Sequence, residues 1–160
     1  MSGTSKEAIK LSEIDFRRMS PEDIPAVLEI ERKLFTDAWN YDHFLHEITE
    51  HVYSVPITAE YKNEIIAYII GWAMFEEFHI ANIAVAEKYH RLGIAECLMQ
   101  YIEWELVTDE KTMMLEVRTS NLPAIRLYEK VGFRVFFERR KFYPDGEDAY
   151  VMIKFLKNGE

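Results

Sequence analysis

Residues 82–106 read NIAVAEKYHRLGIAECLMQYIEWEL, and the order of patterns in this stretch decides the fold. An apolar run stops at Ala86, a short polar and basic segment leads to Gly93, and an amphipathic pattern begins directly afterwards. In that pattern Ile94, Leu98, Tyr101 and Ile102 share one face, which is the spacing of a helix that covers a core. The stretch therefore predicts a strand, a tight turn and a helix.

The turn before this helix has the features of an anion site. The backbone N–H groups of residues 90–95 lead into the positive end of the helix dipole, and Gly93 has no side chain to obstruct a ligand. Lys88 and Arg91 add positive charge. Glycine is also common as plain punctuation between a strand and a helix, so the motif alone fits an ordinary turn as well as a phosphate cradle.

The composition limits the class of protein. A chain of 160 residues with 49% hydrophobic residues suits a single domain, which we assign to residues 1–160. The 19 basic and 28 acidic residues give a formal charge of −9, which argues against a nucleic-acid partner and favours a cationic one such as an amine. No stretch has the length of a signal peptide or a membrane span, so we expect a cytoplasmic protein without a membrane partner and with residues 1–12 as a flexible tail.

The residues that commonly bind metals show no ligand spacing. Cys97 is the only cysteine, which excludes a disulfide framework and a thiolate zinc cluster. The five histidines and the acidic residues form no HExxH-like pattern. We therefore expect no metal.

The chain as a whole predicts an α/β domain with a mixed sheet and helices on both faces. We expect strands at 14–19, 53–61, 64–78, 79–86 and 112–118 and two more within 134–156 around a turn at 144–148, with helices at 20–35, 40–51, from 94 onward and at 120–133. Strand alternation places His79, Ala81, Ile83 and Val85 on one face, and Met114, Glu116 and Arg118 on one face of the neighbouring strand.

Glu116 is the most informative titratable residue, because a carboxylate within the run MMLEV is costly to bury without a partner. One interpretation is a structural ion pair with an arginine such as Arg118 or Arg126. The other is a general base that accepts a proton from an amine, directly or through a water molecule.

Residues 79–152 resemble the GNAT superfamily of acetyl-CoA-dependent N-acetyltransferases. The superfamily signature of Gln or Arg, two residues, Gly, one residue and Gly or Ala corresponds here to His90, Arg91, Leu92, Gly93, Ile94 and Ala95, with His90 as a departure. The segments EVRTSNLPAIRLYEKVGF (116–133) and RRKFYPDGEDAYVM (139–152) resemble the bacterial ribosomal-protein-alanine acetyltransferases and the archaeal relatives of the catalytic subunit of the NatA complex. The first half matches more loosely, through IERKLFTDAWNYDHF (30–44).

The resemblance implies a GNAT fold with about seven strands, in which the parallel strands 79–85 and 112–118 splay apart and acetyl-CoA lies between them. The cofactor-binding residues it implies are Ile83, Ala84, Val85, His90, Arg91, Leu92, Gly93, Ile94, Ala95, Asn121 and Tyr128. It makes Glu116 the base in a direct attack of a neutral amine within a ternary complex. It also makes Tyr128 the residue that assists departure of the thiolate, although a core tyrosine is the plain alternative. His79 either holds a water molecule for Glu116 or is structural, and Asn121 also caps its helix.

The resemblance further implies that the acceptor is the α-amine of a protein N-terminus, with ribosomal proteins among the candidates. Phe35 and Trp39 would wall the first side chain, and Phe142 and Tyr143 would lie beside the peptide backbone, while ordinary packing explains each aromatic residue equally well. A small-molecule (polyamine-type) or lysine acetyltransferase and a non-catalytic acetyl-CoA-binding module remain alternatives. We expect a monomer or a homodimer.

Overall fold

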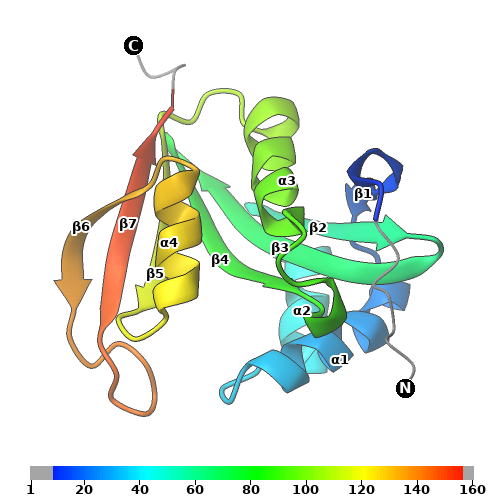
Figure 1. Cartoon of the computed structure of the whole chain (residues 1–160), viewed down its shortest axis with the longest axis horizontal. Coiled ribbons are helices and arrows are strands. Elements are labelled where there is room, and N and C mark those ends of the chain that lie inside the picture. The colour runs from blue at the N-terminus through cyan, green and yellow to red at the C-terminus, as the bar shows by residue number, and fades with distance from the viewer. Residues whose placement is uncertain (1–8, 157–160) are drawn as a thin grey trace, which may run out of the picture.

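The computed structural model describes residues 9–156, and a seven-stranded mixed sheet forms its centre (Figure 1). The strands are β1 Asp15–Arg18, β2 Ser54–Tyr61, β3 Glu64–Met74, β4 Glu77–Val85, β5 Thr112–Arg118, β6 Arg134–Arg139 and β7 Ala149–Phe155. Their order in the sheet is β1-β2-β3-β4-β5-β7-β6. β4 and β5 pair in parallel, and the other neighbouring strands of this sheet pair antiparallel. The predicted mixed sheet is confirmed, and of the predicted tail only residues 9–12 lie within the described range.

Four helices cover the two faces of the sheet: α1 Ile24–Leu34, α2 Tyr41–Thr49, α3 Ile94–Tyr101 and α4 Leu122–Lys130. Buried residues of α1 and α2 pack together with Tyr68, Ile70 and Ala84 of β3 and β4. Buried residues of α3 and α4 form a second cluster with the opposite sides of β2 to β5 and β7. Figure 1 shows α3 and α4 in front of the sheet and α2 behind it. The prediction of helices on both faces is therefore correct.

The start of α1 is fixed by an acidic cap. A 3-10 turn at Pro21–Asp23 precedes the helix, and the Ser20 N–H donates to the Asp23 carboxylate at 2.8 Å. Arg17 of β1 donates to the same carboxylate through both terminal nitrogens, at 2.7 and 2.8 Å. This pair joins the first strand to the first helix, which carries the predicted buried stripe of Ile24, Val27, Leu28 and Ile30.

The turn between β3 and β4 corrects one prediction from the sequence. It lies at Phe75–Glu76, not between residues 78 and 79. Phe75 has a positive φ of 56° and is 93% exposed. Because neither residue of this turn is Gly, Pro, Asn, Asp or Ser, the local sequence contains no turn signal, and the apolar run reads as one long strand.

A β-bulge in β4 corrects a second prediction. Ile70 of β3 pairs with Asn82 and the next residue, Gly71, pairs with Ile80, so Ala81 is an extra residue in β4. The bulge shifts the alternation of side chains by one residue. Phe78, Ile80, Ile83 and Val85 consequently pack on the α3–α4 side, whereas Ala81 and Ala84 pack on the α1–α2 side. The predicted common face of His79, Ala81, Ile83 and Val85 is therefore wrong. The predicted face of Met114, Glu116 and Arg118 on β5 is correct, because the residues between them are buried on the opposite side.

The bulge coincides with the place where the sheet opens. β4 and β5 pair only from Glu77 with Thr112 to Ile80 with Leu115, and Ala81 follows at once. β5 continues alongside β7 as far as Arg118, while β4 continues alongside β3. Figure 1 shows the sheet opening as a V between β4 and β5. The predicted splay of the two parallel strands is confirmed, and it leaves one side of Ala81–Val85 without a neighbouring strand.

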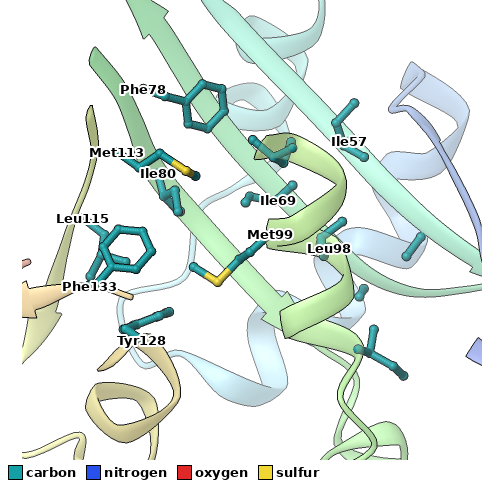
Figure 2. Packing of buried hydrophobic residues seen from close by; sticks show 14 of the residues in the cluster. Ile57, Ile69, Phe78, Ile80, Leu98, Met99, Met113, Leu115, Tyr128 and Phe133 are labelled. Carbon is teal, nitrogen blue, oxygen red and sulfur yellow. The ribbon is translucent and has the colours of Figure 1, made fainter. Parts of the chain in front are cut away.

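The helices that flank this opening are held by the larger core cluster. Figure 2 shows Leu98 and Met99 of α3 pointing toward the strands, and Tyr128 of α4 beside Leu115 and Phe133. α3 continues for one π-helical turn, Ile102–Leu106. The Phe78 ring packs directly on the backbone of Gly71, since a Cβ on Gly71 would lie only 2.0 Å from that ring. Within residues 9–156 no helix is both long and apolar enough to span a bilayer.

Candidate active site

Glu116 and His79 meet where β4 and β5 separate. His79 Nε2 lies 2.6 Å from Glu116 Oε2, and the two side chains are only 18% and 12% exposed. An ionised carboxylate can only accept, so Nε2 carries the hydrogen in this pair. The nearest arginine is Arg139, with Nε 4.0 Å from Glu116 Oε1, and neither Arg118 nor Arg126 is paired with Glu116 among the ion pairs of the described residues. Oε1 is therefore the carboxylate oxygen not bound by His79.

His79 is itself oriented by an aromatic neighbour. Its ring meets the edge of Trp72 at 75° with a centroid separation of 5.2 Å. The Trp72 indole N–H donates to Glu47 of α2 at 2.9 Å. These contacts restrict the rotation of His79 and, through it, the position of the Glu116 carboxylate.

A pocket of about 320 Å³ opens beside Glu116. Its walls come from the split of the sheet, the end of α1 and the segment after it, the cap and last turn of α4, and the β6–β7 loop. Its lining includes seven of the predicted site residues, namely Phe35, Trp39, Ile83, Glu116, Asn121, Tyr128 and Tyr143. The volume lies at the lower end of the range for small-molecule and cofactor sites, about 300–1,000 Å³. His79 does not line the pocket and contacts Glu116 from behind.

Tyr128 and Asn121 bring α4 to the pocket. Tyr128 is buried, its ring contacts Phe133 with a centroid separation of 6.0 Å, and burial raises the pKa of its hydroxyl to about 12. The phenol therefore stays protonated at neutral pH and has a proton to donate to a ligand in the pocket. Asn121 Oδ1 accepts from the Ala124 N–H at 3.3 Å, which confirms its predicted role as the cap of α4.

The turn between β4 and α3 has the backbone geometry of an anion cradle. Arg91 and Gly93 both have positive φ, 65° and 82°, and a Cβ on Gly93 would meet no heavy atom of residues 9–156 within 4 Å. The first N–H groups of α3 have no acceptor within their own helix. His90 Nε2 lies 2.6 Å from the Val85 carbonyl oxygen, so this imidazole fastens the turn to the end of β4.

The other predicted residues take different places. Ile94 is buried beneath the turn, and the side chain of Ala84 is buried on the α1–α2 side, so it could reach the split only through its backbone. Trp39 packs on Phe44 at 5.3 Å. Phe142 is 44% exposed, lies against Tyr143 and does not line the pocket.

Two charged pocket residues have partners that the sequence does not predict. Glu31 of α1 is 2% exposed and accepts hydrogen bonds from Tyr68 Oη, from Asn82 Nδ2 at 2.9 Å and from the Trp39 N–H at 3.1 Å. Arg118 is surrounded by carboxylates. Glu31 sits among charged neighbours in the helix sequence, so only its periodicity on the buried face of α1 could have indicated its role.

The described residues contain no group of three or more His, Cys, Asp or Glu side chains that could hold a metal ion. The pocket thus presents a carboxylate that is paired with an imidazole outside the lining, a protonated phenol, aromatic walls and the charged Glu31 and Arg118, next to a turn that exposes backbone N–H groups.

These features define a class of protein. A mixed sheet that splits at a parallel pair, with a turn suited to an anion after one strand and a carboxylate on the other, fits a site that binds a phosphate-containing ligand beside a general base. The chain belongs to the acetyltransferase (GNAT) family, whose model matches residues 24–133. It is an N-acetyltransferase by this membership and by its relatives.

Individual relatives are similar over most of their length. The putative ribosomal protein bS18-alanine N-acetyltransferase of Bacillus subtilis is 36% identical over 138 residues, covering 85% of this chain and 91% of that protein. An N-alpha-acetyltransferase of Sulfurisphaera tokodaii is 34% identical over 160 residues, covering 91% and 95%. The crystal structure of the ribosomal-protein-S18-alanine N-acetyltransferase from Escherichia coli superposes with a TM-score of 0.81 at 30% identity, covering 89% and 94%.

Proposed function

We propose that this protein transfers the acetyl group of acetyl-CoA to the free α-amine of protein N-termini. The observation that carries the proposal is the Glu116–His79 pair beside a pocket walled by Phe35, Trp39 and Tyr143. The relatives named as N-alpha- and ribosomal-protein-alanine acetyltransferases support the same acceptor class.

The residues of the β4–α3 turn suit the diphosphate of acetyl-CoA. The N–H groups around Gly93 and the positive end of α3 attract an anion, and the space above Gly93 leaves room for it. Ile83–Val85 have no partner strand on the β5 side, so their backbone groups there would be available to the amides of pantetheine. Acetyl-CoA supplies the acetyl group as a thioester.

Glu116 is the proposed base for the acceptor. Its Oε1 accepts a proton from the amine, while His79 donates to Oε2 and holds the carboxylate in one orientation. An α-amine has a pKa of about 8, so an appreciable fraction is neutral at pH 7, whereas a lysine amine near 10.4 is almost fully protonated. A modest base therefore suffices for an N-terminus.

Tyr128 is proposed to hold its proton where negative charge develops on the departing sulfur. Its hydroxyl is buried and protonated, so it donates a hydrogen bond without competition from bulk water. Backbone N–H groups at the open edge of β4 would orient the carbonyl oxygen.

The test compares acceptors and one isosteric variant. Peptides that begin with Ser, Ala, Thr, Met-Leu or Met-Glu are compared with an N-blocked lysine peptide and spermidine, with acetyl-CoA as donor. We expect at least one free N-terminus to give the highest kcat/KM, and Glu116→Gln to lower kcat by about 10² or more with little change in acetyl-CoA affinity. Faster acetylation of spermidine or lysine than of every free N-terminus would overturn the acceptor assignment. Preference for ribosomal proteins, the cytoplasmic location and the oligomeric state stay predictions.

A further inference from the structure

One guanidinium connects the two loops that flank the acceptor side of the pocket. We call residues 35–40, which join α1 to α2, the first loop, and residues 140–148, which join β6 to β7, the second loop. Arg118, at the end of β5, lies between them and is 22% exposed. Its Nη1 donates to Asp145 at 2.8 Å and to Glu147 at 3.0 Å in the second loop, and its Nη2 lies 3.5 Å from Asp37 Oδ2 in the first loop.

The same guanidinium also positions an aromatic wall of the pocket. The Arg118 Cζ atom lies 4.1 Å from the centroid of the Tyr143 ring, which is a cation–π contact. Tyr143 lines the pocket together with Asp37 and Arg118. Glu147 in turn accepts the Ser120 N–H at 3.0 Å, which ties the second loop to the segment before α4.

The first loop is also held to α1 by two backbone N–H groups, of which that of Phe35 donates to the Glu31 carbonyl oxygen at 3.0 Å. The Trp39 N–H donates to Glu31 on the inner side of the loop. Within the second loop the Tyr143 N–H donates to Glu147 and the Gly146 N–H to Tyr143, and at the end of the loop the Asp148 carbonyl oxygen accepts from the Thr119 N–H at 3.1 Å, just after β5. No hydrogen bond or ion pair between these two loops other than through Arg118 is found in the described residues.

The chemistry of arginine suits this position. A planar guanidinium can donate in several directions and stack on a ring at the same time, whereas a lysine ammonium is a point charge on a flexible stem. An exposed ion pair contributes little to stability. The Arg118 guanidinium is mostly buried and contacts three carboxylates and one aromatic ring, and these four contacts together restrict its position.

We infer that Arg118 is a positioning residue that holds the first and second loops at the separation that fits the first residues of the acceptor. The inference rests on the proposed function for the identity of the acceptor, but not for the connection between the loops. Loss of Arg118 removes the connection between the two loops and the ring contact that positions Tyr143, so it weakens acceptor binding and leaves the chemistry at Glu116 and the acetyl-CoA turn intact.

The test uses Arg118→Met, Arg118→Lys and Asp37→Asn, with Arg126→Met as the matched control, since Arg126 is exposed on the neighbouring helix α4. Three measurements are made. Hydrogen exchange of the two loops is followed in the protein without an acceptor, and steady-state kinetics are measured with the best N-terminal peptide. Calorimetry gives the dissociation constant for acetyl-CoA.

Arg118→Met should accelerate exchange in both loops and raise the peptide KM about tenfold or more, with kcat and the acetyl-CoA dissociation constant changed less than threefold. Arg118→Lys should recover part of the KM. Asp37→Asn should accelerate exchange in the first loop only, and its effect on KM should not add to that of Arg118→Met. Arg126→Met should match the wild type.

Three results would overturn the inference: an unchanged peptide KM in folded Arg118→Met, a fall in kcat with KM unchanged, or an equal loss of acetyl-CoA affinity. If Arg118→Met does not fold, an unchanged KM in Asp37→Asn overturns it. Failure of the wild type to acetylate any free N-terminus would instead overturn the proposed function, and the exchange data would still decide whether Arg118 connects the loops.

Discussion

Replacing Glu31 by Gln tests how the floor of the acceptor pocket is built. Both carboxylate oxygens of Glu31 accept hydrogen bonds, Oε1 from the Trp39 N–H and Oε2 from Tyr68 and Asn82. Both oxygens are used as acceptors, so the group fits as a carboxylate and not as a carboxylic acid. Burial and the Glu31 charge raise the pKa of the Tyr68 hydroxyl, which therefore keeps the proton that it donates.

The cost of Glu31→Gln follows from these three bonds. A glutamine oxygen can keep the bonds from Tyr68 and Asn82, but its NH₂ group then faces the Trp39 N–H, which leaves a buried donor without an acceptor at about 1–3 kcal/mol. The two retained bonds lose their charge assistance, roughly 0.5–1 kcal/mol each. The sum is about 3 kcal/mol, which lowers Tm by about 10 °C for a domain of this size.

The assay is urea and thermal unfolding followed by circular dichroism, with Glu29→Gln as the control. Glu29 lies on the same helix, its side chain is 69% exposed and its partner is Lys33 at 3.3 Å, so its loss should cost less than about 0.5 kcal/mol. Stability of Glu31→Gln within 1 kcal/mol of Glu29→Gln would refute the reasoning that the buried carboxylate anchors Trp39.

Three further predictions concern Gly93 in the β4–α3 turn, the Tyr128 hydroxyl, and the loss of stability at low pH. Gly93→Glu should weaken acetyl-CoA binding at least tenfold beyond Gly93→Ala, which shares the backbone strain of a positive φ but not the charge, and calorimetry on the folded variants compares them. Tyr128→Phe keeps the ring against Phe133 and should lower kcat about 10²-fold at unchanged acetyl-CoA affinity. An unchanged kcat would mean that Tyr128 is only a packing residue of the core. The hydrogen bonds from Arg17 hold the pKa of Asp23 below its usual range, so the stability this pair contributes is present above the ordinary Asp pKa and is lost as the pH falls through the lowered value. Asp23→Asn should therefore cost about 2 kcal/mol at pH 7 and progressively less below pH 4 in unfolding titrations, and a constant difference would contradict this.

Much of the fold could be predicted because the relevant signals are local. Gly93 marks the start of α3, Asn121 caps α4, and the apolar spacing of α1 identifies its buried face. The alternation in β5 correctly placed Glu116 apart from its buried neighbours. In each case the deciding residues lie within a few positions of one another, where periodicity and capping chemistry act.

The parts that could not be predicted depend on pairing between distant segments. The bulge arises because Ala81 of β4 has no partner residue on β3, and no residue type in the sequence indicates this. The turn at Phe75–Glu76 uses residues that turns seldom use. The sequence makes Arg118 a candidate partner for Glu116, but its partners come from loops 81 residues before it and about 27 residues after it in the chain, which only the folded arrangement brings together.

The extra residue at Ala81 also links the length of β4 to the opening of the sheet. A chain one residue shorter, without Ala81, would place Phe78, Ile80, Ile83 and Val85 in strict alternation and keep every one of them on its present side of the sheet. Such a β4 would have no irregularity to bend it, and it could continue beside β5 past Leu115 as ordinary sheet. Shortening the chain there would thus favour a more regular sheet at the expense of the opening that holds the site, so selection for stability alone and selection for catalysis act in opposite directions on this one residue.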